Sequence, residues 1–142
     1  MQTIHISKLF RATLLVDAAT CAVMGLLMTL ISTRLSDLLE LPAPLLFYAG
    51  LSLFPFSGFF LYVGTRVKTA TFLAWATVFG NALWALGSIL ILLEGWVTPN
   101  IFGLCFVLFQ AAVVAVLAGL EFIGLRRPEA EDDAAFQHSQ LG

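Results

Sequence analysis

The chain has 142 residues, of which 60% are hydrophobic and 11% are charged, and its mean hydropathy is +0.96. Soluble domains carry about 25% charged residues, so this composition excludes an ordinary water-soluble globule and indicates an integral membrane protein in contact with the lipid bilayer. The formal net charge of −2 gives no basic surface, so a nucleic-acid partner is not expected.

Four long apolar stretches follow one another along the chain. They cover residues 9–31, 45–64, 70–93 and 101–125, and each has about the 20 residues that an α-helix needs to cross a bilayer. The segments between them gather the Pro, Asn and charged residues that the stretches exclude. The sequence therefore predicts an all-α polytopic membrane protein, an antiparallel four-helix transmembrane bundle that forms one domain over residues 1–127.

Lysine and arginine indicate how this bundle is oriented. Arg34 lies on one side of the predicted spans, whereas the other six basic residues lie on the opposite side. These six are Lys8, Arg11, Arg66, Lys68, Arg126 and Arg127. Because basic residues concentrate on the cytoplasmic side of membrane proteins, both termini are predicted to be cytoplasmic.

Two segments outside the spans have their own patterns. In "LSDLLELP", residues 35–42, the leucines fall on one side of a helical turn and the polar residues on the other. This is typical of a short helix in the membrane interface that stops at Pro42, although an ordinary loop is the alternative. Residues 128–142 are acidic and polar and are predicted to form a disordered cytoplasmic tail.

Three polar side chains lie deep in the predicted spans. Counted at about 1.5 Å per residue from the cytoplasmic ends, Asp17 lies about 12 Å, Asn81 about 16 Å and Gln110 about 22 Å into the membrane. A carboxylate at the centre of a spanning helix costs about 2.5–3.5 kcal/mol, so Asp17 is expected to face the bundle interior and to pair with Asn81. Asp17, Asn81 and Gln110 are the candidate intramembrane polar centre, either structural or part of a transport path.

Glu121 is the other acidic residue within a predicted span. The same count places it only about 6 Å from the cytoplasmic end. Its carboxylate is therefore expected near the surface, where Arg126 or Arg127 is able to reach it or its head group extends to water.

Four further residues, Glu121 among them, are candidates for supporting the polar centre. Thr20 shares a helical face with Asp17, and Trp84 shares one with Asn81. Pro55, midway along the second span, lacks an amide hydrogen and leaves the carbonyl of Leu51 free. Either that carbonyl completes the polar centre, or Pro55 only shapes the bundle. The second interpretation is favoured.

Small residues recur at a spacing of four along the last span. Ala111, Ala115 and Gly119 form a ladder that lets helix backbones approach closely. The ladder is able to join helices within one chain or between two copies in a homo-oligomer. The two cysteines, Cys21 and Cys105, lie far apart in apolar stretches and are expected to behave as small hydrophobic residues.

Several kinds of chemistry have no support in the sequence. His5 and His138 both lie outside the predicted spans, so an intramembrane haem held by two histidines is not expected. The chain contains no glycine-rich phosphate loop, no HExxH and no G-x-S-x-G motif. No catalytic residue, metal site or cofactor is therefore predicted, and the protein is not expected to be an enzyme.

Three segments carry a resemblance to known sequences. They are "LLVDAATCAVMGLLM", "GNALWALGSILILLEGW" and "FGLCFVLFQAAVVAVLAGLEFIGLRR". Together they resemble a group of small, uncharacterised four-helix inner-membrane proteins of proteobacteria over most of residues 9–127. The resemblance implies a multi-pass protein of the bacterial inner membrane, and it implies no activity.

Two functions remain open from the sequence. The favoured one is a non-catalytic accessory or scaffolding bundle, in which the contact between Asp17 and Asn81 fixes helix packing. The alternative is an oligomeric, proton-coupled transporter of a cation or a small polar solute, in which Asp17 binds the proton and the solute in turn. Intramembrane acids favour the second function, whereas the absence of a second acid, a basic partner or an internal repeat favours the first.

Overall fold

The structure is a computed structural model that describes residues 2–126 and 137–142. Its elements, in chain order, are β1 (Thr3–His5), α1 (Lys8–Leu30), α2 (Ser32–Leu39), α3 (Ala43–Gly64), β2 (Lys68–Ala70), α4 (Thr71–Leu93) and α5 (Ile101–Arg126). Residues 137–141 are also helical and are exposed. Arg127 and most of the predicted tail lie outside the described residues.

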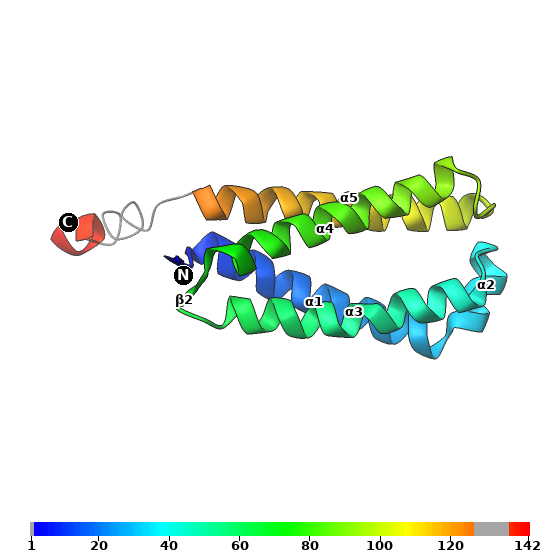
Figure 1. Cartoon of the computed structure of the whole chain (residues 1–142), viewed down its shortest axis with the longest axis horizontal. Helices are drawn as coiled ribbons and strands as arrows, with labels where there is room; N and C mark the ends of the chain where they lie inside the picture. The colour runs from blue at the N-terminus through cyan, green and yellow to red at the C-terminus, as the bar shows by residue number, and fades with distance from the viewer. Residues whose placement is uncertain (1, 127–136) are drawn as a thin grey trace.

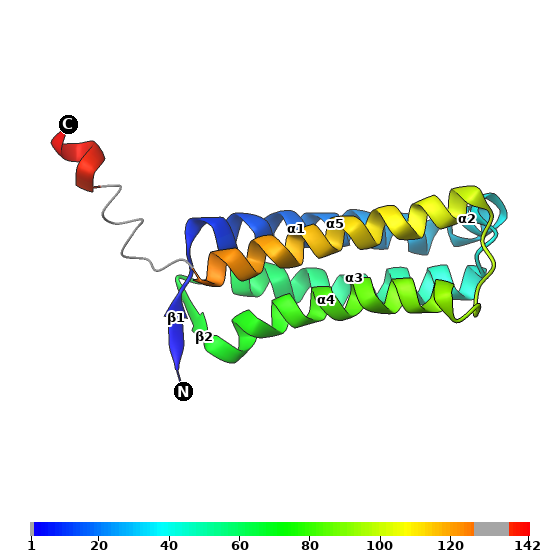
Figure 2. The ribbon, with the colours of Figure 1, turned by 90° about the horizontal axis from the view of Figure 1, so that it is seen from above.

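The long helices α1, α3, α4 and α5 are the predicted spans, and each begins and ends within two residues of the predicted limits. Each is long and apolar enough to cross a membrane. They run side by side with alternating direction and form a bundle (Figure 1; Figure 2). The predicted four-helix bundle of membrane-spanning length is therefore confirmed for the described residues.

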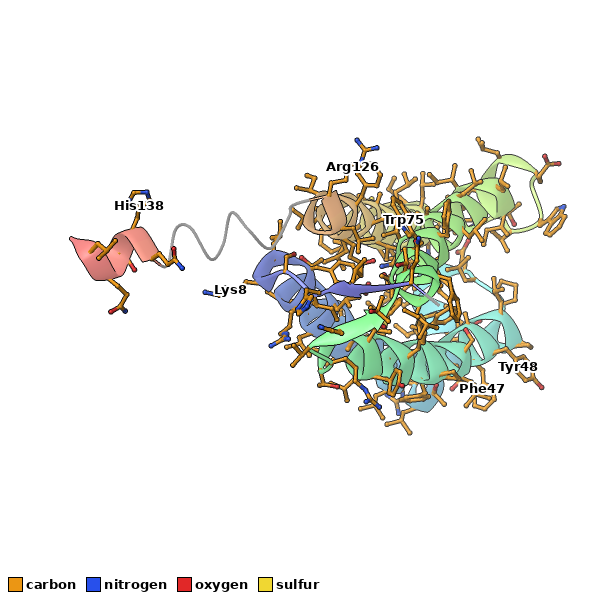
Figure 3. The ribbon with its side chains drawn as sticks, turned by 60° about the vertical axis from the view of Figure 1, so that its left-hand side comes forward. Lys8, Phe47, Tyr48, Trp75, Arg126 and His138 are labelled. Atoms are coloured by element: carbon orange, nitrogen blue, oxygen red, sulfur yellow. The ribbon has the colours of Figure 1, made fainter. Side chains whose placement is uncertain are left out.

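The outer surface of the bundle is apolar, as a surface in lipid must be. Val23, Leu83 and Phe109 are 67%, 66% and 73% exposed. Figure 3 shows Phe47 and Tyr48 pointing outward from α3. Exposure of so continuous an apolar surface to water would be unfavourable. The bundle is therefore an integral membrane protein that contacts the bilayer.

The helices pack as two pairs. The α1 helix packs mainly on α3, the α4 helix packs on α5, and the two pairs join through α1 and α5, whereas α3 and α4 scarcely touch. Glycines permit close approaches between the long helices: a Cβ atom at Gly50 would lie 2.7 Å from the Cβ of Met28, and one at Gly124 would lie 2.8 Å from the amide nitrogen of Phe10. The space between the pairs holds the site described below.

The segment between the first two spans folds as the predicted short helix. In α2 the side chains of Leu35 and Leu39 are buried, whereas Leu38 is 58% exposed. The helix ends at Glu40, which has a left-handed conformation with φ of 52°. Asn100 connects this end of the bundle to α5, because its Nδ2 donates to the carbonyl of Leu38 at 2.8 Å and its Oδ1 accepts from the amide of Gly103 at 2.9 Å.

A pair of short strands at the opposite end was not predicted. The β1 and β2 strands are antiparallel, with Ile4 opposite Thr69, and the amide of Ile6 donates to the carbonyl of Val67 at 3.1 Å. Three-residue strands are too short to leave a periodic signal. The pairing holds the start of α1 beside the start of α4, so these two helices run parallel from the same end of the bundle.

Ser7 fixes the position of α5 at this end. Its hydroxyl oxygen accepts from the amide of Phe10, which caps the N-terminus of α1, and the hydroxyl donates to the carbonyl of Gly124 at 2.9 Å. The contact aligns Gly124 with the first turn of α1. This alignment decides which residues of α1 and α5 meet deeper in the bundle.

Candidate functional site

Asp17, Asn81 and Glu121 meet in the bundle interior. They come from α1, α4 and α5, and their side chains are 1%, 4% and 0% exposed. The Nδ2 group of Asn81 donates one hydrogen bond to Oδ2 of Asp17 and another to Oε1 of Glu121, the second at 2.9 Å. The contact between Asp17 and Asn81 is the one that the sequence predicts. A single amide thus bridges two carboxyl groups, which we call the carboxyl pair, Asp17 and Glu121.

The prediction that Glu121 lies near the membrane surface is wrong. Its Cα is close to the end of α5, but side chains on a helix point toward the N-terminus of that helix. In α5 this direction leads into the bundle, whereas in α1 it leads Asp17 back toward the strand end. Because Gly124 lies beside Phe10, the Cα of Glu121 is about 6 Å nearer to the strand end of the bundle than the Cα of Asp17. The opposite directions of the two side chains nevertheless bring their carboxyl groups together.

The basic neighbours expected for Glu121 do not contact it in the structure. The guanidinium group of Arg126 lies over the ring of Phe122, with its Cζ 4.9 Å from the ring centroid. Arg127 lies outside the described residues. Of the described residues, those that interact with the carboxyl pair are Asn81, Cys21 and Thr77, and none of them is cationic.

Two further polar groups complete the surroundings of the carboxyl pair. The thiol of Cys21 donates to Oδ1 of Asp17 at 3.6 Å, and Thr77 lies beside Glu121 with its hydroxyl donating to the carbonyl of Ala74 at 2.8 Å. The sequence places Cys21 one helical turn after Asp17, and that spacing could have identified it. Thr77 lies one turn before Asn81, on the same face of the helix, which the sequence predicts to turn inward.

The carboxyl pair has one oxygen without a donor. Oε2 of Glu121 is buried and accepts no hydrogen bond from the described residues, although the carboxyl groups of Glu121 and Asp17 lie within reach of each other. Two adjacent carboxylates in a medium of low dielectric constant cannot both be ionised without a cation.

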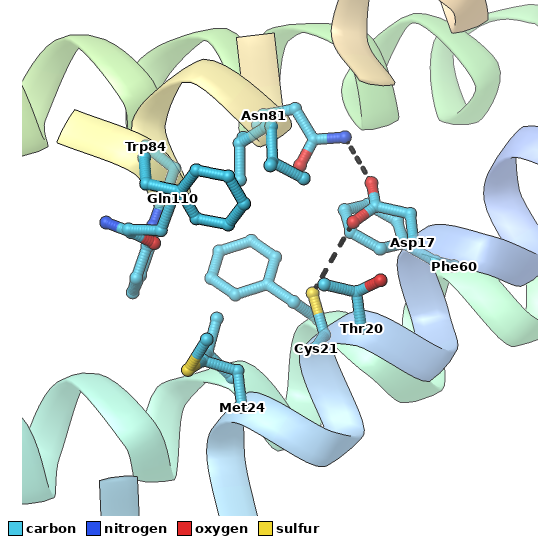
Figure 4. Close-up of a pocket in the computed structure, with 14 residues that line it drawn as sticks. Asp17, Thr20, Cys21, Met24, Phe60, Asn81, Trp84 and Gln110 are labelled. Atoms are coloured by element: carbon cyan, nitrogen blue, oxygen red, sulfur yellow. Dashed lines mark hydrogen bonds between the residues drawn. The ribbon is translucent and has the colours of Figure 1, made fainter. Parts of the chain in front are cut away.

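A cavity of about 100 Å³ adjoins the carboxyl pair. All four long helices line it, and Asp17 and Asn81 form its polar end (Figure 4). Thr20 and Trp84 also line the cavity, although the hydroxyl of Thr20 donates to its own helix, at the carbonyl of Val16. Phe109 is a lining residue and is 73% exposed, so this part of the cavity wall borders the lipid-facing surface of α5.

Gln110 lies at the other end of this cavity and does not bond to Asp17 or Asn81. Its Oε1 accepts from Nε1 of Trp84 at 3.1 Å, and its Nε2 donates to the hydroxyl of Ser88 at 3.0 Å. Gln110 and Trp84 also line a second cavity of about 500 Å³ toward the α2 end of the bundle. This hydrogen-bonded pair therefore lies in the wall of both cavities. Figure 4 shows Gln110 and Trp84 side by side in the wall of the first cavity.

Pro55 does not belong to the site. The α3 helix is continuous through Pro55, whose side chain is exposed, and Leu51 is 46% exposed. Both residues face away from the carboxyl pair because α3 presents Leu53, Phe56 and Phe60 to the cavity instead. The idea that the free carbonyl of Leu51 completes the polar centre is therefore wrong.

The small residues of α5 do not form one continuous contact within the chain. Ala111 is buried, whereas Ala115 is exposed and a Cβ atom at Gly119 would meet nothing within 4 Å.

The two cysteines are both free, with Cys21 buried and Cys105 exposed.

No protein-family model, no curated protein and no solved structure matches this chain in the comparisons made. The site must therefore be interpreted from its own geometry. From the length, composition and packing of its helices, the chain is a small, multi-pass integral membrane protein, with four helices of membrane-spanning length among the described residues.

Proposed function

We propose that this protein is a small proton-coupled transporter of a cation or a small polar solute, with the carboxyl pair as its proton site. The observation that carries the proposal is that one amide, from Asn81, binds both Asp17 and Glu121 inside the bundle. The adjoining cavity gives a solute access to Asp17. The proposed role is binding and exchange, so no catalytic residue, metal or cofactor is required.

The exchange follows from charge balance. When the pair holds its protons, both carboxyl groups are neutral and the bundle interior carries no net charge. When the protons leave, the two negative charges repel each other at short range and require a cation. Protons and a cation therefore compete for the same carboxylates, which is the requirement for coupled transport in opposite directions.

The second acid is the reason to prefer this function to a scaffold. The scaffolding interpretation depends on a single buried acid that is satisfied by Asn81. Glu121 adds a second buried carboxyl group, and its Oε2 is not needed by any hydrogen bond among the described residues. A structural contact gains nothing from such a group, because burying it costs free energy. The accessory or scaffolding bundle stays as the alternative.

The location and the assembly belong to the same proposal. Lys8, Arg11, Arg66 and Lys68 lie at the strand end of the bundle, which favours a cytoplasmic location for that end and for both termini. We infer the bacterial inner membrane from the resemblance described above. The exposed Ala115 and Gly119 are the surface through which two copies would meet as a homo-oligomer.

Infrared difference spectroscopy tests the proton site directly. The protein is placed in lipid nanodiscs, and the C=O stretch of protonated carboxyl groups is followed as the pH changes in H₂O and in D₂O. We expect a band that titrates, shifts in D₂O and weakens in both Asp17→Asn and Glu121→Gln. Matched controls are Asp37→Asn and Glu40→Gln, which remove exposed carboxyl groups of the α2 segment.

The alternative predicts a different spectrum. A sealed structural contact would give a band that neither follows the pH nor exchanges with D₂O, or no buried carboxyl band at all. Either result would refute the proton site and leave the scaffolding bundle as the better interpretation.

A further inference from the structure

We propose that the solute is an amphipathic organic cation, with a charged head group that meets Asp17 and an apolar body that fills the cavity. This inference rests on the proposed function, because it identifies the cation that competes with protons for the carboxyl pair. It depends on the lining of the cavity, on the ligands that the cavity lacks and on the place where it opens.

The lining of the cavity is largely apolar and aromatic. Beyond Asp17 and Asn81, the walls include Phe56, Phe60 and Trp84, and Phe56 packs edge to face with Trp84 at 6.2 Å between ring centroids. Such walls favour an apolar body through the hydrophobic effect. The faces of aromatic rings also attract organic cations, so the whole cavity suits one molecule with both properties.

A hard inorganic cation would be poorly coordinated in this cavity. Ions such as Mg²⁺ and Ca²⁺ need about six or more oxygen ligands at short distance. Here Oδ1 of Asp17 already accepts from Cys21 and Oδ2 from Asn81. An ammonium group with alkyl substituents needs no such set of ligands, because a nearby negative charge and apolar walls are sufficient.

The opening of the cavity points to the same class of solute. Phe109, on α5, lines the cavity and is 73% exposed on the bundle surface. Val113, one helical turn further along, also lines the cavity and is half-buried. An entrance between these side chains would be apolar, so a solute dissolved in the bilayer would cross it more easily than a strongly hydrated ion.

Binding of three probes tests the inference. Purified protein in maltoside micelles, which contain no amine head group, is titrated with benzyltrimethylammonium, tetramethylammonium and Na⁺, and heat and proton release are recorded. We expect benzyltrimethylammonium to bind about tenfold to hundredfold more tightly than tetramethylammonium, because its phenyl ring buries apolar surface that tetramethylammonium lacks. Each bound cation should release protons, and Asp17→Asn should abolish both signals.

A pair of matched variants locates the binding site. Val113→Trp fills the cavity from α5 and should weaken benzyltrimethylammonium binding at least about tenfold. Val116→Trp adds the same side chain on the lipid-facing side of α5, where Val116 is 62% exposed, and should leave binding unchanged. Equal effects of the two substitutions would overturn the assignment to the cavity.

The remaining outcomes separate this inference from the proposed function. If the carboxyl band titrates and exchanges but Na⁺ binds as well as benzyltrimethylammonium, or neither organic cation binds, the solute class is wrong and the proton site stands. If the band does not titrate, the proposed function fails first. A greater affinity for benzyltrimethylammonium with proton release supports both.

Discussion

Substitution of Asn81 by leucine is the sharpest test of the site, because one side chain makes both contacts to the carboxyl pair. Leucine has nearly the shape of asparagine but donates no hydrogen bond, so the change removes the bonds to Asp17 and Glu121 without opening a cavity. The two carboxyl groups stay buried and keep only the weak thiol donor from Cys21.

The expected cost follows from the energies of hydrogen bonds in membranes. Hydrogen bonds between membrane helices contribute on average about 0.6 kcal/mol each and at most about 1.7 kcal/mol. Two such bonds place the loss in the free energy of unfolding at roughly 1–3 kcal/mol, toward the upper end because charged or buried acceptors are left without donors.

Equilibrium unfolding in mixed micelles measures this loss. Thr20→Val is the matched control, because the Thr20 hydroxyl bonds only to the carbonyl of Val16 on its own helix, and we expect a change below about 0.5 kcal/mol for that variant. If Asn81→Leu were as stable as the wild type, the contacts of Asn81 with the carboxyl pair would not hold the helices together. Loss of the infrared carboxyl band without loss of stability would also contradict the assigned geometry.

Three further predictions concern packing and orientation. Gly124→Ala should destabilise the bundle by about 1–3 kcal/mol, since its Cβ would lie 2.8 Å from a backbone nitrogen of α1. The control Gly119→Ala, whose Cβ would meet nothing within 4 Å, should be neutral or slightly stabilising. Similar losses of unfolding free energy in the two variants would count against the packing of α1 on α5. Ser7→Ala should cost about 1 kcal/mol or more, because it removes a helix cap and the bond to α5 together; unchanged thermal stability would argue against that bond. In a cysteine-free background, Gln137→Cys should react with an impermeant maleimide only after the cells are opened, whereas Glu94→Cys should react in intact cells; the reverse pattern would invert the proposed orientation.

Most of the fold was predictable because lipid imposes a simple rule on the chain. Every backbone polar group in the hydrocarbon core must be bonded within a helix, so the length and hydropathy of the apolar stretches were enough to locate all four spans to within two residues. The leucine pattern also favoured a short helix before Pro42, with an ordinary loop as the alternative, and α2 is such a helix, although Leu38 is exposed rather than on the buried side. The β1 and β2 strands were missed because each has three residues and their pairing joins distant parts of the chain.

The candidate site was only partly predictable. The cost of burying a carboxylate indicated that Asp17 needs a partner, and similar depth identified Asn81. Thr20, Trp84 and Gln110 do line the cavity beside them. Pro55 faces away from the site, in line with the favoured interpretation that it only shapes the bundle. A helical wheel could not decide this, because it shows which residues share a face but not which face turns inward when all of them are apolar.

The sequence by itself determined that this is a membrane protein, where its helices begin and end, and that Asp17 must be sheltered. Only the tertiary structure decided that Glu121 is its neighbour. Depth counted along a helix locates the Cα atom, whereas contact depends on the alignment of neighbouring helices and on the direction of each side chain. In this bundle Ser7 and Gly124 set the alignment of α1 and α5, and their antiparallel directions turn the two carboxyl groups toward each other.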